Sequence, residues 1–521
     1  MLLVPTLRTR LLTLTDFLVA ALLATLIVGT TLAFGGATWW ARPAVAALVA
    51  ALTVLAMLRI PLQGAWQLNK SPMLPLGVLA LLLAAVQLAP LPPAVSVAIS
   101  PRSQALYSRG VLPELAWADD PDVLLPTPAD VRSPATVDRP ATVRWLLGAS
   151  ACLAVFAVVS HATDRLGRLR LVWGSIVAAF ALNTAIGLVQ LVGGAGGLYG
   201  AIEPGKGSAF APTHDDLLAT PNATTLRVAG EGDSGWALPR GDRPFLVGSL
   251  MGGPGAYLAL GMLAMPLGLA LTLQLLAPRG SREALGERLR QSGQGGLAFS
   301  LVASTVAGAL MVGLLGGPWL AAPFALGLVL AGIPGGKAAG QRRVAVAITG
   351  LALLALIGGV LVGESGGRPR GVEPPANLAG WSAACGVWRE TLEIARDFPL
   401  VGAGLGSFAT IHSSYKATDA GTTTAGSSLL QWWAEAGVVG LSILGLGALW
   451  VLIRLPLVLR KVGSADRSLA FGLVGAVVGF AILSAVRWTV ELAAVALAAS
   501  AVLGTCDRWL AGGTDLFVDQ P

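Results

Sequence analysis

Twelve apolar runs, each long enough to cross a lipid bilayer, dominate this sequence. A membrane-spanning helix requires about 20 consecutive apolar residues. The runs occupy residues 14–34, 40–59, 73–90, 145–162, 171–193, 255–277, 296–315, 317–334, 343–363, 428–453, 468–487 and 489–506. In lipid, backbone N–H and C=O groups must be satisfied within the segment, so such runs form helices. We therefore predict an all-α, polytopic membrane protein with about 12 transmembrane helices.

The charged residues exclude a soluble chain and a nucleic-acid partner. Only 12% of residues are charged, whereas a soluble globular chain carries about 25%. The net charge is +7, but the basic residues lie between the apolar runs rather than on one soluble face. The three cysteines, Cys152, Cys385 and Cys506, are scattered and predict neither a disulfide framework nor a metal site.

The loops between the runs predict the orientation of the chain. Cytoplasmic loops of membrane proteins carry an excess of Lys and Arg. With the N-terminus in the cytoplasm, the short basic loops lie inside, and the long acidic loops lie outside. We therefore predict a multi-pass protein with both termini in the cytoplasm. The first run is long enough to span by itself, so we expect it to remain as an anchor.

Three parts follow from this topology. Residues 1–363 form an N-terminal membrane region of about nine spans, with long outer loops at 91–144 and 194–254. Residues 364–427 form a third outer loop that contains an amphipathic helix, and residues 428–521 hold the last spans and a short cytoplasmic tail. Because long loops in compact proteins are usually functional or disordered, we expect any chemistry on the outer side.

The third outer loop and the span after it carry the most specific pattern. It reads WRETL at 388–392, DFPLVGAGLGSF at 397–408 and SLLQWWAEAGVVG at 428–440. In this order, after about nine spans, these pieces resemble the C-terminal signature of the O-antigen ligase and polysaccharide polymerase family. Members of this family are membrane glycosyltransferases of the GT-C class. The segments RPF at 243–245 and GAYLA at 255–259 are similar to the family's loop-to-helix segment before the sixth span.

The resemblance implies a GT-C-like bundle that transfers or polymerises a polyprenyl-diphosphate-linked glycan on the outer face of the bacterial inner (cytoplasmic) membrane. The acceptor would be a lipid A core sugar of lipopolysaccharide or a growing glycan chain. Such a reaction needs cations for the diphosphate leaving group, preferably Arg. It also needs a general base near the acceptor hydroxyl, for which His is the usual choice. No metal and no soluble cofactor are implied.

Polar residues of the family pattern are replaced at three places in this chain. Gly426 stands where the family has a His before the third piece, and Ala384 stands where it has an Arg four residues before the Trp. An apolar, Gly-rich run at 246–253 replaces an Asn and an Arg. The chain therefore either uses relocated groups or keeps the scaffold without the chemistry.

His412 is the candidate catalytic residue, because it lies in the same outer loop as Gly426 and could act as a substitute base. The alternative is a loop histidine that makes ordinary hydrogen bonds.

The candidate substrate-binding residues are Arg243, Arg389, Lys416 and Glu435. Arg243 precedes the sixth span, and Arg389 and Lys416 could contribute to a cationic pocket for the diphosphate. Arg389 could equally lie on a solvated helix face with local ion pairs. Glu435 matches the family's Glu. Because a carboxylate at membrane depth usually has a role or a partner, it either contacts substrate or pairs with a residue such as Arg389 or Arg487.

Two hypotheses for function remain from the sequence. The first is an O-antigen ligase-like glycosyltransferase of ligase or polymerase type. The alternative is a non-catalytic family member that acts as a glycan-binding or scaffold component of an envelope polysaccharide pathway. A transporter is favoured by the number of spans alone.

Overall fold

The computed structural model describes residues 5–38, 40–63, 71–115, 132–162, 166–193, 199, 247–250, 253–276, 294–338, 340–367, 378–417, 424–463, 466–487, 489–490 and 492–512. The described part of the chain is helical throughout, apart from turns and one isolated β-bridge between Leu91 and Ser133. The prediction of an all-α, polytopic membrane protein is therefore confirmed.

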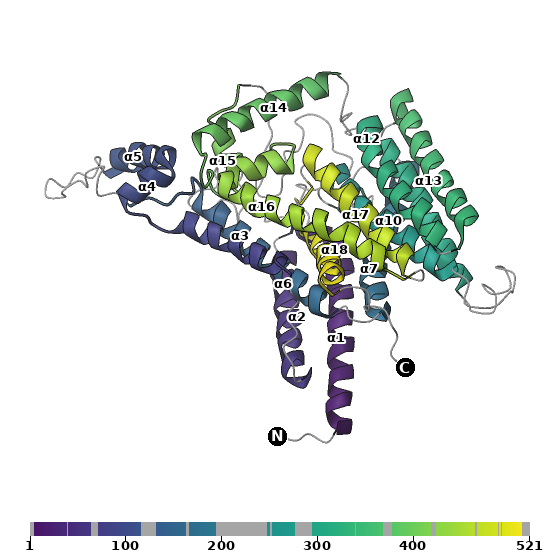
Figure 1. The fold of residues 1–521 in the computed structure, drawn as a ribbon. Helices are drawn as coiled ribbons and strands as arrows, with labels where there is room; N and C mark the ends of the chain where they lie inside the picture. Colours follow the sequence, from purple (N-terminus) through teal and green to yellow (C-terminus); the bar gives the residue numbers. More distant parts are fainter. Residues whose placement is uncertain are drawn as a thin grey trace.

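The elements follow one another along the chain as shown in Figure 1. They are α1 (Pro5–Leu32), η1 (Phe34–Gly36), α2 (Ala41–Gln63), α3 (Met73–Leu88), α4 (Pro93–Ile99), α5 (Pro101–Leu115), α6 (Arg139–Ala162), α7 (Leu166–Gly193), α10 (Gly253–Leu276), α12 (Gly295–Ala338), α13 (Arg342–Val362), η2 (Gly363–Gly367), α14 (Leu378–Asp397), α15 (Phe408–His412), α16 (Ser428–Lys461), α17 (Arg467–Val486) and α18 (Ala493–Gly512).

Each of the twelve predicted runs overlaps a helix, although the boundaries differ. Ten of the described helices are long and apolar enough to cross a membrane. One of them, α12, contains two predicted runs, because its 44 residues are broken at Gly317, whose φ of 66° and ψ of −176° are not helical. The third run forms α3, an apolar helix of 16 residues that is shorter than the other spans.

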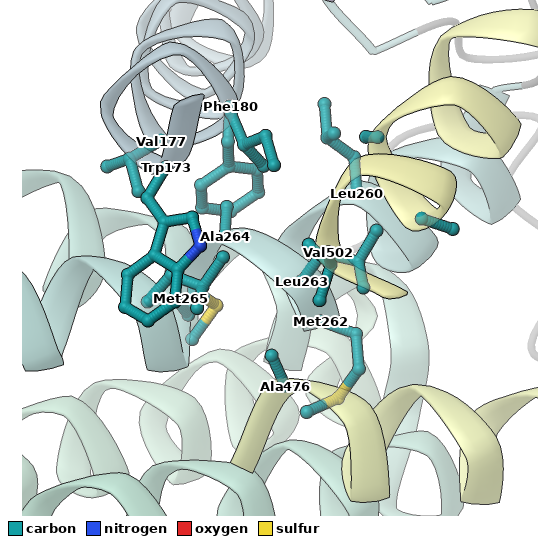
Figure 2. Packing of buried hydrophobic residues seen from close by; sticks show 14 of the residues in the cluster. Trp173, Val177, Phe180, Leu260, Met262, Leu263, Ala264, Met265, Ala476 and Val502 are labelled. Carbon is teal, nitrogen blue, oxygen red and sulfur yellow. The ribbon is translucent and has the colours of Figure 1, made fainter. Parts of the chain in front are cut away.

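The core of the bundle surrounds α10, which is apolar on every side. A helix of this kind has no face suited to water and is stable only when surrounded by protein or lipid. Figure 2 shows residues of α10 packed between α7 on one side and α17 and α18 on the other. The labelled side chains of α7 are Trp173, Val177 and Phe180, and those of α10 include Leu260, Met262 and Met265. All of these residues are at most 3% exposed.

The outer surface of the bundle is also apolar. Large apolar side chains are exposed along α13, at Leu351, Leu354, Ile357 and Leu361, and along α16, at Leu446, Leu449, Leu452 and Ile453. Contiguous apolar patches of this size are rare on soluble monomers. This surface is therefore suited to contact lipid.

The two ends of the bundle differ in their polar chemistry. We call the end that carries α4, α5, α14 and α15 the α14 end; there α14 lies across the bundle above α15 and α16 (Figure 1). At the opposite end, Arg59 and Arg168 both form ion pairs with Asp16. Asp507 of α18 accepts hydrogen bonds there from the hydroxyls of Ser71 and Ser160.

Glycines allow α12 and α13 to cross at very close range. A Cβ atom added to Gly313 of α12 would lie 2.1 Å from the carbonyl oxygen of Leu356, and one added to Gly359 of α13 would lie 2.1 Å from that of Leu310. Small residues of this kind let membrane helices approach closely and gain van der Waals contact. The neighbouring Gly358 faces open space, with nothing within 4 Å of an added Cβ.

We predict that Gly359→Ala destabilises the bundle by about 1–3 kcal/mol, the typical effect of overpacking, because the new methyl group meets backbone on α12. Gly358→Ala is the matched control on the same helix, and it should leave the melting temperature unchanged or slightly raised, since Ala favours helix over Gly. Thermal unfolding of the purified variants in detergent measures both effects. Equal melting temperatures for the two variants would contradict the close crossing.

Candidate functional site

The turn at residues 398–407 fills a break in helix α16. Gly437 interrupts α16 with a φ of 62° and a ψ of −161°, so the amides that follow it lose their helical acceptors. The N–H groups of Val438 and Val439 instead donate to the carbonyls of Pro399 and Leu400, at 2.8 and 3.1 Å. In the reverse direction, the turn donates from Ala403 to the carbonyl of Ala434, at 2.9 Å. The turn and the helix break thus satisfy each other's backbone groups.

This contact requires glycine at two positions. Gly402 has a φ of 77°, and a Cβ atom there would lie 2.2 Å from the backbone of Glu435. A Cβ on Gly437 would lie 2.4 Å from the carbonyl oxygen of Leu400. Only glycine combines a positive φ with such close backbone approach at little cost. The glycines of the 397–408 piece therefore shape a tight turn.

Glu435 is the buried acceptor for this turn. Its carboxylate accepts hydrogen bonds from the backbone N–H groups of Gly406, at 2.8 Å, and Phe408, at 3.1 Å. The side-chain amide of Gln431, one helical turn earlier, donates a third bond at 3.1 Å. The sequence suggested Arg389 or Arg487 as a structural partner. The structure instead provides backbone amides, which a sequence pattern does not reveal.

Gln87 of α3 completes the same polar cluster from the other side. Its amide nitrogen donates to the carbonyls of Val401, at 2.6 Å, and Glu435, at 2.9 Å. Its amide oxygen accepts from the N–H of Leu405 at 3.0 Å. A fully buried Gln87 is thus matched by three backbone groups, and it ties α3 to the turn. The sequence analysis did not identify Gln87. A single polar side chain near the end of an apolar run could have indicated a residue with buried hydrogen-bond partners.

His412 lies in α15 and forms a buried pair with Glu390 of α14. Its Nε2 atom is 2.8 Å from a carboxylate oxygen of Glu390, and both residues are at most 3% exposed. The ring of His412 stacks on that of Phe408, with centroids 5.1 Å apart. The other oxygen of Glu390 accepts from the N–H of Ala417 at 2.9 Å. Because a buried carboxylate needs partners, this arrangement fixes both the loop and the orientation of the imidazole.

Glu390 is the second residue that sequence reasoning missed. It lies on the buried stripe of α14, together with Val387, Thr391 and Ile394. Residues at this spacing share one helix face. A carboxylate within an apolar stripe is therefore the signal that could have identified Glu390 as a residue with a buried partner.

The remaining predicted residues are distributed around this pair. Arg389 directly precedes Glu390, and its side chain is 85% exposed and lies 3.9 Å from Glu393 on the same helix. Lys416 is exposed, and the residue after it, Ala417, donates a backbone hydrogen bond to the carboxylate of Glu390. Arg243 lies outside the described residues. Arg389 and Lys416 are thus exposed sequence neighbours of Glu390 and of Ala417, and Phe408 contacts both Glu435, through its backbone N–H, and His412, through its ring.

The α14 end is further held by contacts to α5 and to Asp138, the residue before α6. Tyr415 donates a hydrogen bond to Asp397 at the end of α14, and Arg102 of α5 lies 3.5 Å from the same carboxylate. Burial, together with this bond to Asp397, raises the pKa of Tyr415 to about 12, so its hydroxyl remains a donor at neutral pH. Thr410 of α15 donates to Asp138 at 2.6 Å. The segment around His412 is therefore attached at several points.

Gly426 has space around it where the family pattern has a histidine. Its φ is 66°, and among the residues that the structure describes, an added Cβ would have only Trp388 Nε1 within 4 Å, at 3.8 Å. The following Ser427 caps α16 by accepting from the N–H of Leu430, and it donates to the carbonyl of Ala485 in α17. Across the described part of the chain, no group of three or more His, Cys, Asp or Glu side chains could hold a metal ion.

Comparisons with known proteins leave the family open. No family model matches the sequence, and no curated protein matches it.

We predict that Glu435→Ala destabilises the protein by about 2–6 kcal/mol, because the buried N–H of Phe408 and the partly buried N–H of Gly406 would lose their acceptor and each such loss costs about 1–3 kcal/mol. Glu393→Ala, on the exposed face of α14, is the control and should melt as the unchanged protein does. Thermal unfolding in detergent tests both. A Glu435→Ala variant with an unchanged melting temperature would refute the role of this carboxylate in holding the turn.

Proposed function

We propose that this chain is an O-antigen ligase-like membrane protein, which transfers or polymerises a polyprenyl-diphosphate-linked glycan on the outer face of the bacterial inner membrane. The observation that carries the proposal is the His412–Glu390 pair: Glu390 belongs to the first piece of the family-like pattern, and His412 lies between the second and third pieces. In this assignment, the α14 end faces outward and both termini are cytoplasmic.

The carboxylate of Glu390 orients the imidazole of His412, which is one of the features that general-base catalysis requires. A carboxylate that accepts a hydrogen bond from one imidazole nitrogen holds the other nitrogen as the acceptor. In the proposed reaction, His412 takes the proton of the acceptor hydroxyl as its oxygen attacks the anomeric carbon of the donor sugar. The bond from this carbon to the diphosphate oxygen breaks, and the diphosphate leaves with the electron pair. Arg389 and Lys416, both exposed, supply positive charge for the leaving group.

Burial of His412 favours a second candidate function. At 2% exposure, its ring can meet a substrate hydroxyl only after neighbouring side chains move. Gly426 also lacks the side chain that the family pattern places there. Both observations suit a non-catalytic protein that binds a glycan or acts as a scaffold in an envelope polysaccharide pathway, with the His412–Glu390 pair as a structural element.

Substitution of the pair should separate the two candidates. If His412 is the base, His412→Gln and Glu390→Gln should lower glycan transfer by about 100-fold or more, the usual contribution of a general base. The assay uses the full chain reconstituted in liposomes with a polyprenyl-diphosphate oligosaccharide and a glycan or lipid-linked acceptor, with the product resolved by electrophoresis. Glu393→Gln, on the exposed face of the same helix, should retain activity.

Melting temperatures of the same variants give the second measurement. Full transfer by His412→Gln in a folded protein would exclude His412 as the base. If, in addition, deletion of the whole chain still stops glycan assembly in cells, the non-catalytic candidate gains support.

We also predict that Arg389→Gln weakens donor binding and raises the apparent KM for the polyprenyl-diphosphate donor by about 5- to 10-fold, as expected for loss of roughly 1 kcal/mol of charge-assisted contact. Arg396→Gln is the matched control, because Arg396 is also exposed on α14 but lies about 10 Å further along the helix. Kinetics at varied donor concentration distinguish the two variants. Equal KM values for both would remove Arg389 from the donor site.

A further inference from the structure

A groove lies at the end of the bundle opposite to the α14 end, and its lining residues belong to other helices than the His412–Glu390 pair. It has a volume of about 490 Å³ and is lined by residues of α7, α10 and α12. Its walls are apolar, and the lining side chains include Ala178 and Leu182 of α7, Leu271 and Leu275 of α10, and Leu297 and Leu301 of α12. A volume of this size falls within the range of about 300–1,000 Å³ that is usual for ligand pockets.

The groove opens toward the surface that we assign to lipid. Leu182 is 44% exposed and Leu297 is 54% exposed, although both line the groove. Its inner wall is closed by α10, where Leu271 is 7% exposed. An apolar molecule in the bilayer can therefore enter sideways between α7 and α12.

The length of the groove matches one leaflet of a bilayer. Its lining on α7 runs from Arg170 to Leu182, a distance of about 18 Å at 1.5 Å per helical residue. Half of the hydrocarbon core of a typical bilayer is about 15 Å thick. Arg170 lies near the start of α7, and Gln274 lies near the end of α10, so both lie at the headgroup level of the leaflet at the opposite end.

The polar residues of the groove gather at this headgroup level. The guanidinium of Arg170 donates from Nε to the side-chain oxygen of Gln274 at 3.1 Å, and Gln274 is 8% exposed. This bond holds the guanidinium of Arg170 at the headgroup end of the apolar groove. An apolar groove between transmembrane helices with a basic residue at its headgroup end is complementary to an anionic lipid.

We propose that this groove binds one acyl chain of an anionic phospholipid from the leaflet at the opposite end, with the phosphate of its headgroup beside Arg170. The acyl chain supplies most of the contact, and Arg170 selects for negative charge. This site is separate from the proposed glycan site at the α14 end and does not depend on it.

Lipid-dependent stabilisation of the delipidated full chain in detergent tests the proposal. Dioleoyl phosphatidylglycerol, which is anionic, should raise the melting temperature by several degrees, and the zwitterionic dioleoyl phosphatidylcholine should raise it less. Glycerol 3-phosphate, which has no acyl chain, should leave the melting temperature unchanged. Ala178→Trp fills the groove and should abolish the shift with both lipids. Val189→Trp is the matched control, because Val189 is 73% exposed on the same helix and does not line the groove.

Arg170→Gln tests the headgroup contact separately. It should retain the shift with phosphatidylcholine and lose the additional shift with phosphatidylglycerol, whereas Lys337→Gln, at an exposed basic residue of the same end, should lose neither. If Ala178→Trp does not fold, Gly174→Leu, at another lining position, takes its place. A full phosphatidylglycerol shift in a folded, groove-filled variant would overturn the proposal, as would an equal shift with glycerol 3-phosphate.

Discussion

The exchange of backbone hydrogen bonds between the 398–407 turn and the break in α16 is the contact on which the α14 end depends. A helix break inside an apolar protein exposes N–H and C=O groups that cost several kcal/mol each if left unpaired in an apolar medium. Here the turn supplies acceptors for Val438 and Val439 and a donor for Ala434. Neither segment could adopt this conformation alone, so they must form together.

This interlocking gives the family-like pieces a structural meaning. Gly402 and Gly437 allow the two backbones to approach, and Glu435 binds the amides of the turn. Gln87 adds the same kind of support from α3. The pieces at 397–408 and 428–440 therefore encode a folded unit, and the contacts between them are structural rather than catalytic. The chemistry, where it exists, depends on the separate pair of His412 and Glu390.

The sequence predicted the spans well, because long apolar runs in lipid have only the helix available to them. It did not predict the partners of Glu435, since backbone amides have no sequence signature. It also missed Glu390, because its buried position depends on the packing of α14 against α15. The fold class can thus be predicted from the position of the apolar runs in the sequence. The site cannot, because tertiary contacts decide which polar groups meet.

The enclosed position of α10 bears on how the protein is assembled during synthesis. Of the helices around it, α7 precedes α10 in the chain, but α12, α17 and α18 follow it. Until these are made, α10 must lie in lipid with several faces uncovered, and its uniform apolarity makes this stage tolerable. The carboxylate of Asp507 belongs to α18, which enters last, after both of its serine partners. Because Ser71 and Ser160 precede Asp507 in the chain, they are already present when α18 inserts, and the carboxylate of Asp507 is not left without hydrogen-bond partners in the bilayer.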